Sequence, residues 1–485
     1  MMKLKHLLLY IGCALLAASC TDRPTNPINA ETLPQIFPDY VGVTIPADIA
    51  PMNFNIAGDN FEKMDVTVTG SKGGEMHVNG GYAHFDEDKW HELTKKNKGG
   101  KLVFTVCVKR KGQWTRYRSF DMYISPNDLG EWGLTYRKIA PGYEVYSRMG
   151  IYQRNLSNFE ETPILENTAV PGSCMNCHTA NRTNPQQFTF HVRGSHGATL
   201  VSINGQREWL KARNEEVGGS MVYPYWHPSG RYCAYSTNKT HQSFHVVRSE
   251  RIEVFDQASD VFVYEPRTHR VIKSPLVMTK DHFETYPVFS ADGRWLYFCS
   301  SKAQPIPSGY KNIRYNLCRI AFDPSTGSFG NKVDTVFNAA AMGKSLTFPR
   351  PSYDGKYLLF TMADYGCFPI WHKEADLWMM NLNNGKAWRM NEADSPDTDS
   401  FHNWSTNSRW IVFSSRRGNG LYTRLYIAAI NDKGRATKPF LLPQENPWEY
   451  YDECTYSYNV PDFTLTPVKF DARAAGREIA SDVRK

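Results

Sequence analysis

The chain has 485 residues and a formal net charge of +7. This is longer than one typical domain, so two or more domains are expected. A hydrophobic content of 41% and an aromatic content of 13% exclude a disordered chain. No long run of lysine or arginine occurs, so the modest, diffuse positive charge does not indicate nucleic-acid binding and is compatible with small anionic ligands.

The first twenty residues predict export. The segment "MMKLKHLLLYIGCALLAASC" has a basic start, an apolar run and small residues before Cys20, which is the pattern of a secretory signal. Its apolar run is too short for a permanent membrane helix, which takes about 20 residues. The ending "LLAASC" resembles the lipobox of bacterial lipoproteins. Residues 1–19 are therefore expected to be a lipoprotein signal peptide, with a plain signal peptide cut near Ala18 as the alternative.

The lipobox resemblance implies a membrane anchor. A fatty acid such as palmitate would be attached through Cys20, and the protein would lie at the outer membrane, on the cell surface or the periplasmic face. Residues 20–38 are polar and rich in proline, which is typical of a semi-extended tether.

Residues 39–128 differ in character from the rest of the chain. Segments such as "KMDVTVTG" and "KLVFTVCVKRKG" are short, alternating and separated by glycine-rich turns. This pattern predicts a small Ig-like β-sandwich. It contains no catalytic constellation.

A repeated pattern dominates the second half of the chain. Four segments begin with an aromatic residue, turn at a Ser/Asp/Gly/Asn cluster and continue as an aromatic, β-branched strand: "YPYWHPSGRYCAYST", "YPVFSADGRWLYFCS", "FPRPSYDGKYLLFTM" and "FHNWSTNSRWIVFSS". Each is followed by a further strand, for example "DLWMMNLNNGK". Strands and tight turns at a period of roughly 50 to 60 residues predict one four-stranded propeller blade per repeat.

These repeats resemble the PD40 repeat of TolB-like β-propellers. The resemblance implies an all-β protein with a six-bladed propeller over residues 129–470, a C-terminal tail at 471–485, and seven blades as the alternative. Two weaker segments, "YSRMGIYQRNLSNFEETPIL" and "FTFHVRGSHGATLVSINGQREWL", would be outer strands of degenerate early blades.

Residues 171–181, "PGSCMNCHTAN", contain a Cys-x-x-Cys-His motif. In haem c the two thiols form thioethers with the vinyl groups, and the histidine becomes the proximal iron ligand. The motif predicts haem c on Cys174 and Cys177 with His178 as that ligand; the sixth ligand is not readable. A Cys174–Cys177 disulfide, half a zinc site and a dithiol redox site are the alternatives. The repeat pattern places the motif on a loop between degenerate blades.

Hydrolytic chemistry finds no support in the sequence. It contains neither a Gly-x-Ser-x-Gly elbow nor a His-Glu-x-x-His helix. The aspartates of the blade turns are explained as turn formers. A binding protein, redox-active if haem is attached, is therefore expected, and not an enzyme.

A propeller gathers loops from all blades around one mouth, where a ligand meets several chain segments. Aromatic and cationic residues there would suit an anionic, partly aromatic ligand. The predicted ligand-binding residues are Tyr225, Trp226, Lys239, His241, Lys302, Arg314, Tyr315, Arg350, Trp371, His372, His402, Arg416 and Arg417.

The layout as a whole resembles propeller lipoproteins of Bacteroidetes that carry a Cys-x-x-Cys-His motif. Such surface lipoproteins commonly serve TonB-dependent transporters, so the resemblance implies a ferric siderophore as ligand and iron transport as function. A c-type haem electron-transfer protein on a propeller scaffold is one alternative. A TolB-like protein-interaction platform in the envelope is the other.

Overall fold

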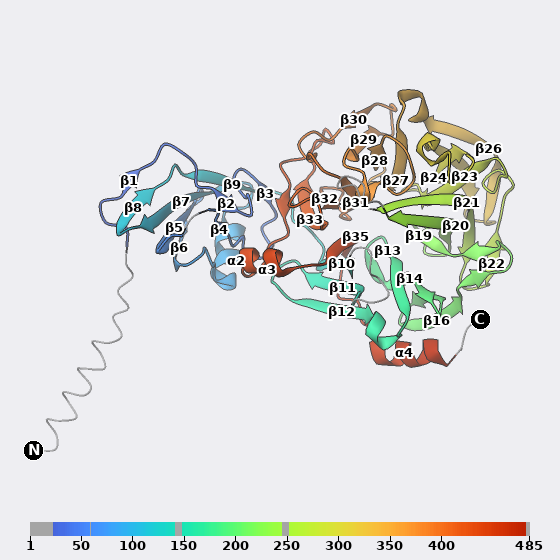
Figure 1. Ribbon diagram of the computed structural model, residues 1–485, viewed down its shortest axis with the longest axis horizontal. Helices are drawn as coiled ribbons and strands as arrows, with labels where there is room; N and C mark the ends of the chain where they lie inside the picture. Colours follow the sequence, from blue (N-terminus) through green and yellow to red (C-terminus); the bar gives the residue numbers. More distant parts are fainter. Residues whose placement is uncertain (1–22, 59, 141–147, 245–251, 482–485) are drawn as a thin grey trace, which may run out of the picture.

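The computed structural model describes residues 23–58, 60–140, 148–244 and 252–481. The expected signal peptide and Cys20 lie outside the described residues. Figure 1 shows a smaller lobe, coloured blue, beside a larger ring that contains most of the chain. No helix in the described ranges is long and apolar enough to cross a membrane.

The ring consists of six four-stranded antiparallel sheets, which confirms the six-bladed propeller. Blade 1 contains β10 (Gly133–Ile139), β11 (Gly150–Asn155), β12 (Glu161–Glu166) and β35 (Ser457–Thr464); blade 2 contains β13 (Ser173–Asn181), β14 (Asn184–Gly194), β15 (Ala198–Ile203) and β16 (Gln206–Lys211). Blade 3 contains β19 (Val222–Trp226), β20 (Cys233–Phe244), β21 (Ile252–Glu265) and β22 (Arg270–Ile272); blade 4 contains β23 (His282–Phe289), β24 (Trp295–Lys302), β25 (Asn316–Asp323) and β26 (Ser328–Phe337). Blade 5 contains β27 (Ser345–Pro351), β28 (Tyr357–Ala363), β29 (Asp376–Asn381) and β30 (Ala387–Arg389); blade 6 contains β31 (Asp399–Trp404), β32 (Trp410–Ser415), β33 (Arg424–Ala429) and β34 (Phe440–Leu441).

The C-terminal strand closes the ring. In blades 2 to 6 the first strand of the blade is innermost, and these strands contact one another around the axis. In blade 1 the innermost strand is β35, which pairs with β10 more than 300 residues earlier in the chain. This pairing completes blade 1 with a strand from the other end of the chain and so joins the two ends of the ring.

Each innermost strand carries a β-bulge near its middle. The residue at the bulge has a positive φ in all six strands: Cys177 (53°), Tyr223 (50°), Tyr286 (53°), Phe348 (52°), Phe401 (48°) and Val460 (50°). A bulge inserts one residue and redirects its side chain. The rings of Tyr286 and Phe348 lie 4.2 Å apart and those of Phe348 and Phe401 4.9 Å apart, so aromatic side chains fill part of the axis.

The N-terminal lobe is built around one seven-stranded sheet. Its strands are β1 (Ile28–Asn29), β3 (Thr44–Ile45), β5 (Lys63–Gly70), β6 (Glu75–Gly80), β7 (Lys101–Arg110), β8 (Gln113–Arg116) and β9 (Phe120–Ile124). The expected sandwich thus takes the form of one large sheet, a two-stranded sheet of β2 (Ile36–Phe37) and β4 (Asn55–Ile56), and helix α2 (Glu87–Lys96). Helix α2, which the strand pattern did not predict, begins at Asp86, whose side chain accepts the Lys89 N–H.

The remaining elements are short. They are β17 (Arg213–Asn214), β18 (Gly219–Ser220), α3 (Pro447–Glu453), α4 (Ala472–Ala480) and the 3-10 turns η1 (Asn167–Ala169), η2 (Tyr310–Asn312), η3 (Ala340–Met342) and η4 (Pro369–Trp371). The expected C-terminal tail therefore contains a helix. Its Glu478 accepts a hydrogen bond from Arg207 at 2.6 Å, which holds α4 against β16 of blade 2.

Candidate functional site

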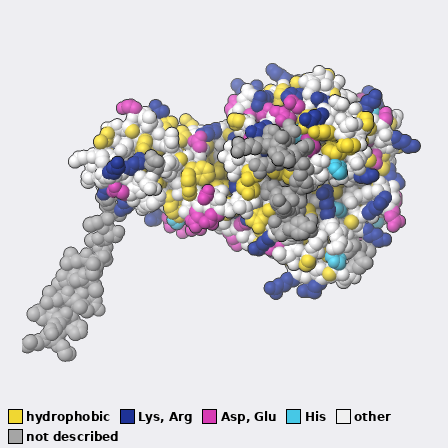
Figure 2. Space-filling view, in the orientation of Figure 1, with side chains coloured by type: hydrophobic (Ala, Val, Ile, Leu, Met, Phe, Trp, Pro, Cys, Tyr) yellow, Lys and Arg dark blue, Asp and Glu magenta, His cyan; other side chains and the backbone are white. Residues whose placement is uncertain are grey.

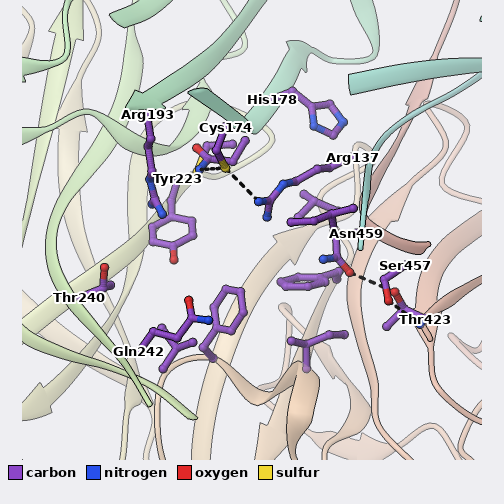
Figure 3. A pocket seen from close by; sticks show the side chains of 18 of the residues that line it. Arg137, Cys174, His178, Arg193, Tyr223, Thr240, Gln242, Thr423, Ser457 and Asn459 are labelled. Carbon is purple, nitrogen blue, oxygen red and sulfur yellow. Dashed lines mark hydrogen bonds between the residues drawn. The ribbon is translucent and has the colours of Figure 1, made fainter. Parts of the chain in front are cut away.

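A cavity of about 400 Å³ lies on the axis of the ring. Five of the six bulge residues line it, and the exception is Tyr286. Figure 3 shows labelled side chains from several blades around an open space, with Cys174, Arg137, Arg193 and Tyr223 gathered on one side. The inner strands of the ring therefore build this cavity.

The Cys-x-x-Cys-His motif lies in this cavity. The prediction of an inter-blade loop was wrong, because Cys174, Cys177 and His178 belong to β13, the innermost strand of blade 2. Residues three apart in a regular strand face opposite sides. The bulge between Asn176 and Thr179 shifts that alternation, so both cysteines and the histidine line the cavity.

The two thiols are free and differ in environment. The Cys174 sulfur accepts a hydrogen bond from Arg137 Nη2 at 3.1 Å. Burial raises the pKa of the Cys177 thiol above its usual value. The disulfide alternative is thus not realised in this structure.

His178 is 3% exposed, and its ring has a backbone hydrogen bond with Thr135 but no side-chain partner among the described residues. Burial lowers the pKa of His178 to about 4, so the imidazole is neutral near pH 7. A neutral imidazole with a free lone pair is what a metal ligand requires. The residues of the motif therefore fit a haem c group.

A preformed zinc site at the motif does not occur in the described part of the chain. Three His, Cys, Asp or Glu ligand atoms within 4.8 Å of one another are found at Asp376, Asp394 and Asp399, and not at the motif. Tetrahedral zinc needs about four converging ligands. The zinc alternative therefore has no support in this geometry.

The cavity is basic. Four arginines line it, Arg137, Arg193, Arg350 and Arg416, and its described lining contains no aspartate or glutamate. Arg416 also lies over the Trp371 ring at 4.4 Å from its centroid. Guanidinium groups and an aromatic face together suit a planar anion.

A buried ion pair joins two wall segments of the cavity. His372 follows η4, and Nε2 of its ring lies 3.2 Å from both carboxylate oxygens of Glu253, which lies between two lining residues of β21. The Tyr365 hydroxyl donates to the same carboxylate at 3.0 Å. Burial lowers the pKa of His372, but hydrogen bonds and charge from Glu253 and Glu374 raise it to about 9. This pair fixes the wall that carries Trp371.

Three predicted ligand-binding residues line the central cavity: Arg350, Trp371 and Arg416. His372 lies directly behind its wall. Tyr225 and Trp226, together with Arg350, line a much smaller cavity of about 20 Å³ farther along the inner strands.

The other predicted residues are not at the mouth. Lys302 and Arg314 line a separate outer cavity in blade 4, while Tyr315 and His402 are buried. Burial lowers the pKa of His402 to about 3. Arg417 is held by Asp399 at 2.6 Å. Lys239 and His241 are exposed on β20, where His241 falls between the lining residues Thr240 and Gln242.

The sequence analysis missed several lining residues. They are Arg137, Arg193, Thr240, Gln242, Thr423, Ser457 and Asn459. Arg137 and Arg193 come from the degenerate blades, and Ser457 and Asn459 from the closing strand. The signal that could have found them is the bulge position, at which Cys177 and Val460 replace the aromatic residues of the four clear repeats.

No family model and no curated protein matches the chain. Several solved structures do. TolB from Acinetobacter baumannii is 13% identical over 78% of this chain and 86% of its own, with a TM-score of 0.43. The periplasmic gluconolactonase PpgL of Pseudomonas aeruginosa is 12% identical over 84% of this chain and 100% of its own, with a TM-score of 0.38. An oligogalacturonate lyase from Vibrio parahaemolyticus is 11% identical over 59% of this chain and 85% of its own, with a TM-score of 0.32.

Proposed function

We propose that the central cavity binds a small anionic ligand with an aromatic or otherwise flat part. The observation that carries this proposal is the charge of the lining: four arginines and, among the described residues, no carboxylate. Trp371, Phe348 and Phe368 supply aromatic faces in the same cavity. A pocket of this size with a few convergent charged groups is a usual small-molecule site.

A ferric siderophore of the catecholate class meets both requirements, because it is anionic and aromatic. In this proposal the protein is an outer-membrane lipoprotein anchored through Cys20 that captures the iron complex and passes it to a TonB-dependent transporter. The protein would act by binding, without hydrolysing its ligand.

Tryptophan fluorescence tests this proposal. A ferric catecholate complex should quench the emission at micromolar concentration, and Trp371→Phe should remove most of the quenching. Arg193→Gln, an exposed lining residue, should weaken binding by about tenfold. Arg314→Gln, outside the cavity, is the matched control and should bind as the wild type does. An affinity that changes neither with salt concentration nor with Arg193→Gln would contradict an anionic ligand.

A second function, electron transfer by haem c, is favoured by one specific observation. The buried His178 has no side-chain hydrogen-bond partner among the described residues, and Cys174 and Cys177 line the same cavity. Cys174 and Cys177 would hold the group covalently, His178 would ligate the iron, and arginines of the lining would pair with propionates. When bound, haem supplies one-electron chemistry.

Whether haem is attached is tested on a denaturing gel and by the mass of the chain. We expect the chain expressed with cytochrome c maturation machinery to retain haem on a denaturing gel, and Cys174→Ala/Cys177→Ala to lose it. His178→Gln should keep covalent haem but shift its absorption spectrum, because the iron ligand is changed. A chain of bare polypeptide mass from the same expression would leave ligand capture as the remaining function. Since both groups occupy one cavity, the haem-loaded protein should not bind the iron complex.

A further inference from the structure

We propose that Arg137 is the oxyanion-binding residue of the central cavity, and that Cys174 beside it is a modification site for anionic electrophiles. This inference rests on the proposed function, because it concerns the same cavity. It adds the chemical class of the group that is recognised, a planar oxyanion such as a carboxylate.

The first step is an account of the arginine charges. Arg416 donates to backbone carbonyls and lies 3.5 Å from an Asp397 carboxylate oxygen. Arg350 donates from Nε to the Asn403 side-chain oxygen at 2.9 Å. Arg137, by contrast, donates to one acceptor among the described residues, the Cys174 sulfur. A thiol is a weak acceptor, so the charge of this half-buried guanidinium is poorly compensated.

The second step is the shape of the free edge of Arg137. Its Nε is buried and has no hydrogen-bond partner among the described residues, while Nη2 donates to the Cys174 sulfur. Nε–H and Nη2–H form one side of the planar guanidinium fork. A carboxylate accepts from both at once, whereas a single sulfur atom accepts from one. An entering carboxylate would therefore displace the thiol from Arg137 and gain a second hydrogen bond.

The third step concerns the two cysteines. Cys174 and Cys177 are both free and both line the cavity, but Arg137 contacts Cys174. Figure 3 shows Cys174 between Arg137 and Arg193 at the edge of the open space. An anionic reagent drawn to these cations thus reaches the Cys174 sulfur first.

Alkylation by a charged and a neutral reagent measures this property directly. The full chain, expressed without haem maturation, is treated with iodoacetate or iodoacetamide, and modification of each cysteine is followed by peptide mass spectrometry. The thiolate sulfur attacks the α-carbon, the carbon–iodine bond breaks, iodide leaves, and the thiol proton passes to solvent. The same chain in denaturant gives the intrinsic preference for the two reagents.

We expect the iodoacetate-to-iodoacetamide rate ratio at Cys174 to be about tenfold higher in the native protein than in the denatured chain. Arg137→Gln should bring the ratio most of the way down to the denatured value, with Arg193 supplying what remains, and Arg314→Gln should leave it high. A native ratio equal to the denatured one overturns the inference, as does a high ratio retained in Arg137→Gln. A native-like circular dichroism spectrum of Arg137→Gln shows that the variant has folded.

The two proposals fail separately. Ligand-dependent quenching with an unchanged alkylation ratio would leave the proposed function standing and reject Arg137 as its oxyanion site. A high ratio without quenching by the iron complex would keep the oxyanion site and reject the siderophore as its ligand.

Discussion

The His372–Glu253 pair combines two charges that are almost fully buried, with 1% and 2% of the side chains exposed. A buried pair adds little over an apolar pair, but removing one partner leaves the other charge without compensation. Here that charge would sit directly behind Trp371 and the start of β21, which both form the cavity wall. Stability and the shape of the cavity wall are therefore coupled at this residue.

Replacing His372 by glutamine should lower the free energy of unfolding by about 3 kcal/mol near pH 7. The folded pKa of about 9 lies above the ordinary value of 6.5, so the histidine contributes fully below pH 6.5. That contribution is lost as the pH rises through 9. Urea unfolding between pH 6 and pH 10 measures the change. The difference between wild type and His372→Gln should shrink over this range.

The exposed pair of His282 and Asp281 provides the control for this prediction. Its two side chains are 41% and 76% exposed, so solvent screens their attraction. His282→Gln should leave the free energy of unfolding almost unchanged. An equal loss of unfolding free energy in both variants would mean that the buried pair at the cavity wall stabilises the protein no more than the exposed pair does.

Which side chains line the central cavity was only partly predictable from residue type. Arg350, Trp371 and Arg416 were predicted and line the cavity. Arg417 follows Arg416 in the chain, yet the carboxylate of Asp399 holds it elsewhere. Cation and aromatic content identifies candidates, but strand alternation and local ion pairs decide which of them face the axis, and neither can be read from composition.

The blades were predictable at the scale of the element because each repeat carries its own turn and strand signal. The turn "SADGR", for example, connects β23 to β24, and Gly293 in it has a φ of 73°. The position of the Cys-x-x-Cys-His motif was not predictable in the same way. In β13 the bulge breaks the alternation of inward-facing and outward-facing residues, and a cysteine replaces the aromatic residue of the clear repeats. The sequence of this strand therefore reads as a loop. Helix α2 was missed because its short polar sequence lies between strands.

At the scale of the whole molecule, the N-terminal lobe and the propeller share one hydrophobic core. That core joins residues of β5, β7 and α2 to Trp410 of blade 6 and to Tyr458 and Phe463 of the closing strand. The Trp410 indole N–H also donates to the Asp128 carbonyl between the lobes. We therefore expect the two units to unfold together, although their sequence patterns read as separate domains.

Phe463 tests this coupling, because it is 0% exposed, belongs to β35 and lies in the shared core. Phe463→Ala should lower the free energy of unfolding by about 3 to 5 kcal/mol, since it leaves a cavity where ring closure and the lobe contact meet. Leu465→Ala, two residues later and 38% exposed, should cost less than about 1 kcal/mol. Urea unfolding followed by circular dichroism and by tryptophan fluorescence should give one coincident transition in both variants. Two separate transitions in the wild type, with only the later one moved by Phe463→Ala, would instead mean that the lobe folds independently of the closed ring.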